Sequence, residues 1–213
     1  MRVVLVFAPV FDIRTPYLGL PYLKSSLERA GVYCKCLDFN IRYGEATAAI
    51  QGDRAAEQDI ASRPELVDAW VDEICSHRPD IVGFTVFVFN ERTVRLIALR
   101  LRERLPGVLI VCGGPTIVRE HFNHIEYCLS FADCAVDGEA ESVMVEIARA
   151  REQGKDLREL RQLWMLDPNG KPVFSGHGVQ QDLNTILPPD FSDYRLADYA
   201  SERRLPMLFS RGC

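Results

Sequence analysis

The feature that most constrains the fold is a regular alternation of short β-rich runs with helical patterns over residues 1–155. The run "VVLVFAP" at residues 3–9 is almost continuously apolar, which is typical of a parallel strand covered on both faces. The stretch "YLGLPYLKSSLERAG" then places its leucines on one helical face and ends at Gly31. A strand followed by a helix, repeated along the chain, predicts βαβ units.

We expect four further strands in this part of the chain, interleaved with helical segments. The helical pattern after the second strand has Pro64 at a fresh helix start, and the amphipathic run from Glu91 ends at Pro106 and Gly107. Together these segments predict a Rossmann-like (flavodoxin-like) α/β fold, with a doubly wound parallel five-stranded sheet in the order 2-1-3-4-5. The four strands are "VYCKCLDFN", "DIVGFTVFVFN", "VLIVCGGPT" and "DCAVDGEAE".

The pattern changes after residue 155. The run "LWMLDPNGKPVFSG" has two apolar stretches around Pro-Asn-Gly, which predicts a β-hairpin. The polar stretch that follows contains Pro188-Pro189 and is expected to be an extended linker over a surface, so that residues 156–204 form a hairpin and linker. Residues 205–213 then have the composition of a buried strand and a turn ending at Cys213, as at the start of a further site.

Composition excludes several classes of protein. The formal net charge is -5 and the isoelectric point about 5.5, so no basic surface favours nucleic acid or an anionic membrane. The N-terminal apolar run is broken by Pro9 and is too short for a membrane span. Seven cysteines without a C-x-x-C pair or a signal peptide indicate the reducing cytoplasm. All except Cys213 are expected to be buried thiols.

A ligand is expected at the carboxyl ends of the parallel strands, where the turns are rich in small residues. Gly113 and Gly114 lack Cβ atoms, so a large flat ligand could press against the backbone there, although such glycines also occur in ordinary turns. We expect Thr116 and Glu141 to begin helices and to offer free N–H groups. The four turns are "PVFDIRTPYLG", "FVFNE", "CGGPT" and "DGEAE".

Several more specific sites are absent or weak. No G-x-G-x-x-G follows the first strand, and the chain contains no G-x-x-x-x-G-K-[ST] motif, which disfavours dinucleotide and P-loop sites. Asp12 stands alone after the first strand, where a phosphoryl receiver needs clustered acids. His121 and His124 have a spacing that could share a metal, but a solvated helix face is the simpler interpretation. His77 is interpreted as a loop residue.

Taken in order, these pieces resemble the cobalamin-binding radical SAM enzymes, including the anaerobic magnesium-protoporphyrin monomethyl ester cyclase type. In that family a Rossmann-like B12-binding domain precedes a radical SAM barrel, whose first strand leads into C-x-x-x-C-x-x-C. The resemblance implies that residues 1–155 bind cobalamin and that residues 205–213 are the first strand of a truncated barrel. The pieces that carry it are "TPYLGLPYLKSSLERAG", "DIVGFTV", "CGGPT", "DGEAE", "DLNTILPPDF" and "SRGC".

The same resemblance implies the cofactors. Cys213 would be the first of three ligands of a [4Fe–4S] cluster, whose open iron binds S-adenosylmethionine in the full-length parent only. One cysteine cannot hold such a cluster, so this 213-residue chain alone is expected to be catalytically inactive. Within it, the implied cobalamin contacts are Pro16, Tyr17, Leu18, Gly19, Thr85, Val86, Gly113, Gly114, Pro115, Thr116, Gly138, Glu139 and Glu141.

One departure concerns the lower face of the cofactor. Many B12 domains carry D-x-H-x-x-G after the first strand, and their histidine binds cobalt from below. Here Arg14 stands at the histidine position and Tyr17 at the glycine position, and no histidine precedes His77. Radical SAM members commonly lack this motif as well, so the resemblance implies cobalamin without histidine ligation.

Three interpretations of the function remain open at this stage. The first is the cobalamin-binding domain of a B12-dependent radical SAM enzyme, whose parent is a methyltransferase or a cyclase acting on an unactivated carbon, with its own C-terminal barrel as partner. The second is a flavodoxin-like nucleotide or flavin carrier without catalysis, which leaves "SRGC" and the long linker unexplained. A domain that has lost its ligand and serves only as a docking platform for the barrel is a third possibility.

Overall fold

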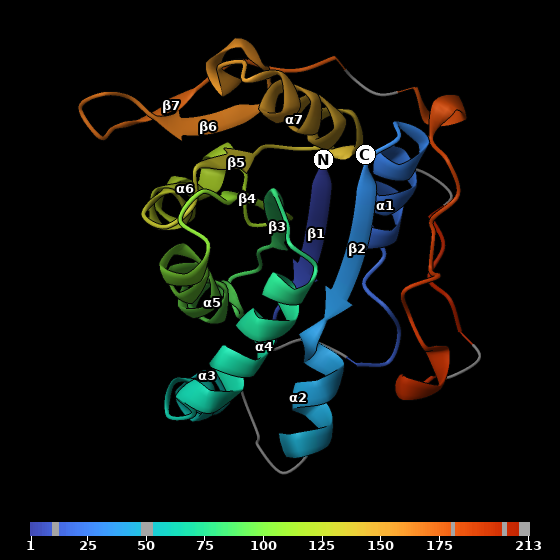
Figure 1. Cartoon of the computed structure of the whole chain (residues 1–213). Coiled ribbons are helices and arrows are strands. Elements are labelled where there is room, and N and C mark those ends of the chain that lie inside the picture. Colours follow the sequence, from blue (N-terminus) through green and yellow to red (C-terminus); the bar gives the residue numbers. More distant parts are fainter. Residues whose placement is uncertain (10–12, 48–52, 180–181, 202–203, 209–213) are drawn as a thin grey trace.

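The structure is a computed structural model that describes residues 1–9, 13–47, 53–179, 182–201 and 204–208. Its centre is one sheet with the strand order β2-β1-β3-β4-β5-β6-β7 (Figure 1). The first five strands are parallel, so the predicted fold class and the order 2-1-3-4-5 are confirmed. These strands are β1 (Arg2–Phe7), β2 (Tyr33–Asp38), β3 (Ile81–Thr85), β4 (Leu109–Gly113) and β5 (Cys134–Val136).

Helices cover both faces of the sheet, as a doubly wound fold requires. On one face, α1 and α7 pack against each other and against the sheet, and the other described helices lie on the opposite face (Figure 1). The helices are α1 (Gly19–Arg29), α2 (Phe39–Thr47), α3 (Asp53–Ala61), α4 (Pro64–Ser76), α5 (Glu91–Arg104), α6 (Phe122–Leu129) and α7 (Glu141–Gln153). Pro64 begins α4, as predicted.

Strand β1 explains why its sequence is apolar without a break. Val3 and Leu5 point into the core beneath α1 and α7, whereas Val4 and Val6 point into the core on the opposite face. Successive side chains of a strand alternate between faces, and here both faces are covered. All four side chains are therefore at most 1% exposed.

The sheet has seven strands rather than the predicted five. The hairpin is formed by β6 (Leu163–Leu166) and β7 (Pro172–Phe174), as predicted, but it also joins the sheet, with β6 antiparallel to β5. Strand β5 would otherwise be an open edge of unpaired backbone groups, which β6 covers. The hairpin thus lies next to the last turn of the parallel sheet.

Two other local features of the structure differ from what the sequence indicates. Helix α2 directly follows β2, and the sequence patterns did not predict it. Residues 204–208 form no strand, and Leu205, Met207 and Leu208 are 45%, 69% and 44% exposed. A strand needs a neighbour for its backbone groups, and none of the described strands pairs with this segment. Cys213 lies outside the described residues.

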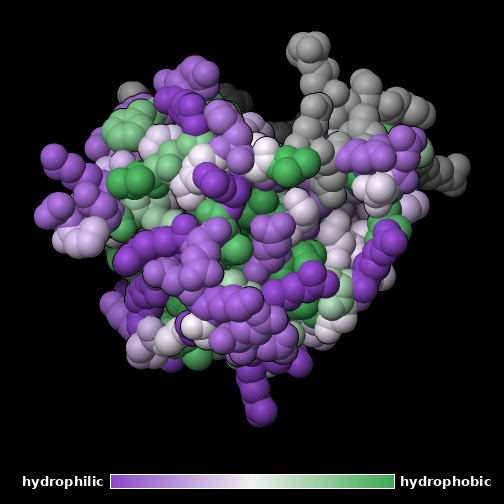
Figure 2. Space-filling view, turned by 90° about the horizontal axis from the view of Figure 1, so that it is seen from above, coloured by the Kyte–Doolittle hydropathy of each residue, from purple (hydrophilic) through white to green (hydrophobic). Residues whose placement is uncertain are grey.

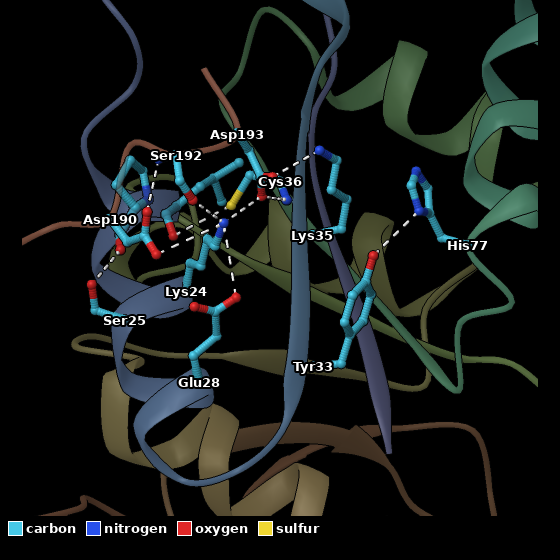
Figure 3. A network of polar contacts seen from close by, with 12 residues as sticks. Lys24, Ser25, Glu28, Tyr33, Lys35, Cys36, His77, Asp190, Ser192 and Asp193 are labelled. Atoms are coloured by element: carbon cyan, nitrogen blue, oxygen red, sulfur yellow. Dashed lines mark hydrogen bonds and ion pairs between the residues drawn. The ribbon is translucent and has the colours of Figure 1, made fainter. Parts of the chain in front are cut away.

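The predicted linker lies along α1 and β2 (Figure 1). Lys24, buried on α1, places Nζ 2.6 Å from Ser192 Oγ and 2.9 Å from Asp193 Oδ2 (Figure 3). The Asp193 carboxylate also accepts a 2.8 Å hydrogen bond from the Cys36 backbone N–H and a 2.7 Å bond from Lys35. These contacts connect the linker to two elements of the α/β domain.

Several large apolar side chains of the described residues are exposed. In the view from above, hydrophobic areas appear as separate patches among hydrophilic ones (Figure 2). Val88, Val179 and Met207 are among the most exposed, at 55%, 92% and 69%. None of the described helices is long and apolar enough to cross a membrane.

Candidate ligand-binding site

The turns after β1, β3, β4 and β5 meet at one edge of the sheet, and a cavity of about 510 Å³ opens there. The space lies over the sheet surface between α1 and α7. Parallel sheets place their ligand sites at this edge, near the switch point between β1 and β3. Eight of the predicted contact residues line the cavity: Tyr17, Gly19, Thr85, Gly113, Gly114, Gly138, Glu139 and Glu141.

The other five predicted contacts, Pro16, Leu18, Val86, Pro115 and Thr116, do not line the cavity. Val86 is fully buried and Pro115 is exposed. The expectation that Thr116 begins a helix is wrong. Its backbone lies in a tight turn, closed by a 3.0 Å hydrogen bond from the Ile117 N–H to the Gly114 carbonyl, and its side chain is buried. Glu141, in contrast, does begin α7.

The floor of the cavity is a part of the site that sequence reasoning missed. It consists of strand residues that the apolar patterns predict only as core: Leu5, Gly83, Val111 and Val136. Only Gly83 could have indicated this floor from the sequence, since a glycine inside a strand often marks the close approach of another group. A Cβ atom at Gly83 would lie 2.8 Å from Leu5 Cδ2. The missing Cβ therefore makes room for the Leu5 side chain in the floor of the cavity.

The turn after β4 depends on its second glycine. Gly114 has φ +110°, a conformation that side-chain-bearing residues rarely adopt, and a Cβ atom there would lie 2.8 Å from the Val86 carbonyl oxygen. Gly113 has ordinary φ, and a Cβ atom there would meet only Val136 Cβ at 3.9 Å. Gly114 thus fixes the path of the turn, and Gly113 keeps the space next to it open.

Aromatic and polar side chains stand beside this apolar floor. The Phe7 and Tyr17 ring centroids are 5.0 Å apart, and the Tyr17 ring meets Phe87 edge-on at 5.4 Å. Burial, and then the nearby negative charge of Glu141, raise the pKa of the Tyr17 hydroxyl above its usual value. Tyr17 is therefore a neutral hydrogen-bonding group beside Glu141, a residue that is 5% exposed.

The structure does not assemble a metal site from the described residues. The His121 and His124 rings are 6.0 Å apart, and His124 Nδ1 lies 2.6 Å from Glu91 Oε2. No cluster of three potential metal ligands occurs among the residues with described positions. His77 caps the C-terminal end of α4, and its Nδ1 lies 3.5 Å from the Tyr33 hydroxyl. Asp12, the only acid in the turn after the first strand, lies outside the described residues.

Fold and cavity together define an α/β ligand-binding domain, with an apolar, glycine-lined site at the carboxyl edge of a parallel sheet. A family model described as "B12 binding domain" matches residues 6–148 of the chain. The chain belongs to the B12-binding domain family.

Similar proteins include two curated enzymes. The chain is 28% identical over 157 residues to the anaerobic magnesium-protoporphyrin IX monomethyl ester cyclase of Synechocystis sp., covering 67% of this chain and 29% of the relative. It is 30% identical over 107 residues to the cobalamin-dependent radical SAM methyltransferase TokK of Streptomyces tokunonensis, covering 49% of this chain and 16% of the relative. The chain thus spans less than a third of either relative's length.

Solved structures share the fold at low sequence identity. OxsB, a cobalamin-dependent S-adenosylmethionine radical enzyme with aqua-cobalamin and S-adenosylmethionine bound, superposes with a TM-score of 0.63 at 18% identity over 95% of this chain and 25% of its own. The methyltransferase TsrM from Kitasatospora setae, with cobalamin and a [4Fe-4S] cluster bound, gives 0.57 at 20% identity over 82% and 30%.

Proposed function

We propose that the cavity between α1 and α7 holds cobalamin, and that the chain is the cofactor-binding part of a B12-dependent radical SAM enzyme. The observation that carries the proposal is the position of the cavity, at the glycine-rich turns of the sheet. All of its lining residues except Leu5 and Leu208 lie within the residues matched by the B12-binding family. Its volume of about 510 Å³ lies in the range of small-molecule sites.

The side chains present fit a corrinoid better than a charged nucleotide. The floor is apolar, and Gly113 has no Cβ atom in the wall where a bulky ligand would approach. The polar groups of the site are few: Thr85, Tyr17 and Glu141 can orient the ligand through hydrogen bonds. Pro16, Leu18, Val86, Pro115 and Thr116 would act by shaping the turns rather than by lining the cavity.

The activity of the parent protein extends this proposal. With Cys213 as the first cluster ligand, a [4Fe–4S] cluster and S-adenosylmethionine would supply a 5′-deoxyadenosyl radical, and cobalamin a reactive cobalt centre, when bound in the full-length parent. The residues of this chain would bind and orient cobalamin and exclude water from its buried part. Methyl transfer and ring formation both stay open for the parent, because relatives of both kinds match the chain.

The main alternative is a flavodoxin-like flavin or nucleotide carrier, and the family match favours cobalamin over it. The cavity of about 510 Å³ is large enough for a ligand, and this argues against a docking platform that has lost its ligand. We propose a cytoplasmic location as well, since the six described cysteines are all free thiols and five of them are buried.

The experiment that tests the cofactor is direct. Purified chain is mixed with hydroxocobalamin or with FMN, desalted, and examined by visible absorbance. The proposal predicts equimolar retention of cobalamin and no retention of FMN. Retention of FMN alone would support the carrier, and loss of both would support the docking platform.

A further inference from the structure

Gln162, just before β6, has an unusual left-handed backbone conformation. Its φ is +65°, in the left-handed region that residues with long side chains rarely adopt. Such a conformation persists only where the surroundings fix it, and it is often found at functional sites. Gln162 also lies outside residues 6–148, the part matched by the B12-binding family.

The contacts of Gln162 converge on the turn after β5. Its side-chain Nε2 donates to the carbonyl oxygens of Asp137 (3.1 Å) and Glu139 (3.2 Å), so both N–H donors of the amide are engaged. Its own backbone carbonyl accepts a 2.9 Å hydrogen bond from the Asp137 N–H, and its N–H donates to the Gly176 carbonyl at 2.8 Å. One residue thus holds the backbone on both sides of Gly138.

This turn is part of the cavity wall. Gly138 and Glu139 both line the cavity, and Gly138 has φ +92°, a left-handed conformation that glycine adopts more readily than other residues. Trp164, two residues after Gln162, donates from Nε1 to Asp137 Oδ2 at 3.0 Å. The hairpin therefore restrains this turn through backbone and side-chain contacts together.

A second glycine makes room for the Gln162 side chain. A Cβ atom built at Gly178 would collide with Gln162 Oε1 and Cδ, the outer part of that side chain. Gly178 has ordinary φ, so alanine there is not strained by its backbone. A methyl group at position 178 would displace the Gln162 amide without changing Gln162 itself.

We infer that Gln162 is a positioning residue for the cofactor site: its amide fixes the turn of residues 137–139 in the shape that the ligand meets. The inference rests on the proposed binding of cobalamin. It assigns a role in that site to the hairpin, which the family match does not cover. The left-handed backbone of Gln162 is what aims its side chain back at the turn.

The test compares Gln162→Gly with wild type. Glycine suits the positive φ, so the variant removes the amide without straining the backbone, and we expect a melting temperature within about 3 °C of wild type. Loss of two hydrogen bonds should weaken hydroxocobalamin binding about tenfold in Kd. Hydrogen exchange of the ligand-free protein should be faster in the peptide that contains residues 134–141.

Gly178→Ala should also weaken hydroxocobalamin binding and speed hydrogen exchange at residues 134–141. The double variant should bind hydroxocobalamin no more weakly than Gln162→Gly alone, because both changes act through the same amide. Arg78→Gly is the matched control: it is the other described non-glycine residue with positive φ, and it lies before β3, at the opposite end of the sheet. It should leave Kd and the exchange at 134–141 unchanged.

The outcomes separate this inference from the proposed function. If wild type binds cobalamin and Gln162→Gly binds it equally well, the positioning role is wrong. If wild type does not bind cobalamin, the proposed function fails, and hydrogen exchange alone decides whether Gln162 restrains the turn. Unchanged exchange at residues 134–141 in Gln162→Gly would overturn the inference in either case.

Discussion

Lys24 Nζ on α1 and Asp193 Oδ2 in the linker are 2.9 Å apart, and the Lys24 side chain is only 5% exposed (Figure 3). The ion pair joins two segments that are far apart in the sequence. Helix α1 begins at Gly19, and its first residues line the cavity. The linker therefore supports one wall of the candidate site, although none of the labelled network residues of Figure 3 reaches the ligand space itself.

Asp193→Ala should lower the free energy of unfolding by about 3 kcal/mol, because it leaves Lys24 buried without its main partner. Urea unfolding followed by circular dichroism measures the change. Glu103→Ala is the control, since it removes an exposed partner of Arg100 and should cost less than about 1 kcal/mol. Equal decreases in the free energy of unfolding of the two variants would show that the buried pair stabilises the fold no more than an exposed pair does.

The raised pKa of the Asp38 carboxyl group predicts that the stability of the fold depends on pH. Burial raises the pKa of its carboxyl group from 3.8 to about 6, against hydrogen bonds from the Tyr199 hydroxyl and the backbone of Asn40 and Ile41 that lower it. Because the folded-state pKa is raised, the contribution of Asp38 to stability is fully present below about pH 3.8 and is lost as the pH rises through about 6. The Asp38 carboxylate still accepts a 2.7 Å hydrogen bond from Tyr199.

Asp38→Asn removes this titration. The free energy of unfolding of the variant, relative to wild type, should rise by about 1 kcal/mol between pH 5 and pH 7. Urea unfolding of both proteins at the two pH values measures it, and the comparison cancels the titration of groups that the two proteins share. A difference that is the same at both pH values would contradict a raised pKa at Asp38.

The parallel sheet was predictable because its information is local. Continuous apolar runs such as the one at Val3–Phe7 identify strands buried on both faces, and the glycines of the turns marked the carboxyl edge. The floor of the cavity was not predictable in the same way, since Leu5 and Val111 have the sequence character of ordinary core residues. Which core residues border an open space depends on the packing of α1 and α7, and this packing is not encoded in any single segment.

The pairing of the hairpin with the sheet was likewise not predictable from local sequence. Pro-Asn-Gly identified the turn of the hairpin, but β-hairpin signals do not indicate which strand the hairpin pairs with. The contact of Gln162 with Asp137 joins residues that no short-range pattern connects. For the segment at residues 204–208, apolar composition predicted a strand, although strand formation also requires a partner strand.

Gly114→Ala should destabilise the domain more than the same substitution at a surface glycine does. The new side chain would be strained at φ +110° and would press on the Val86 backbone, which should cost more than about 1 kcal/mol. Gly107→Ala is the control, because a Cβ atom there would meet nothing within 4 Å. Thermal unfolding of both variants measures the difference, and equal melting temperatures would argue against a strained turn at Gly114.

Cobalamin bound to this chain should lack histidine ligation. None of the described residues that line the cavity is a histidine, and Arg14 stands at the position of the motif histidine. The EPR spectrum of the Co(II) form should therefore show no nitrogen splitting from an imidazole. A histidine-nitrogen splitting would contradict both the sequence prediction and the composition of the cavity wall.

The most direct measurement is a calorimetric titration of the chain, Gly113→Leu and Gly107→Leu with hydroxocobalamin. A leucine at Gly113 would extend from a wall of the cavity, whereas one at Gly107 would extend from an open loop. We predict equimolar binding to wild type and to Gly107→Leu, and binding at least about tenfold weaker to Gly113→Leu. Equal affinity of all three proteins would place cobalamin outside this cavity and contradict the account.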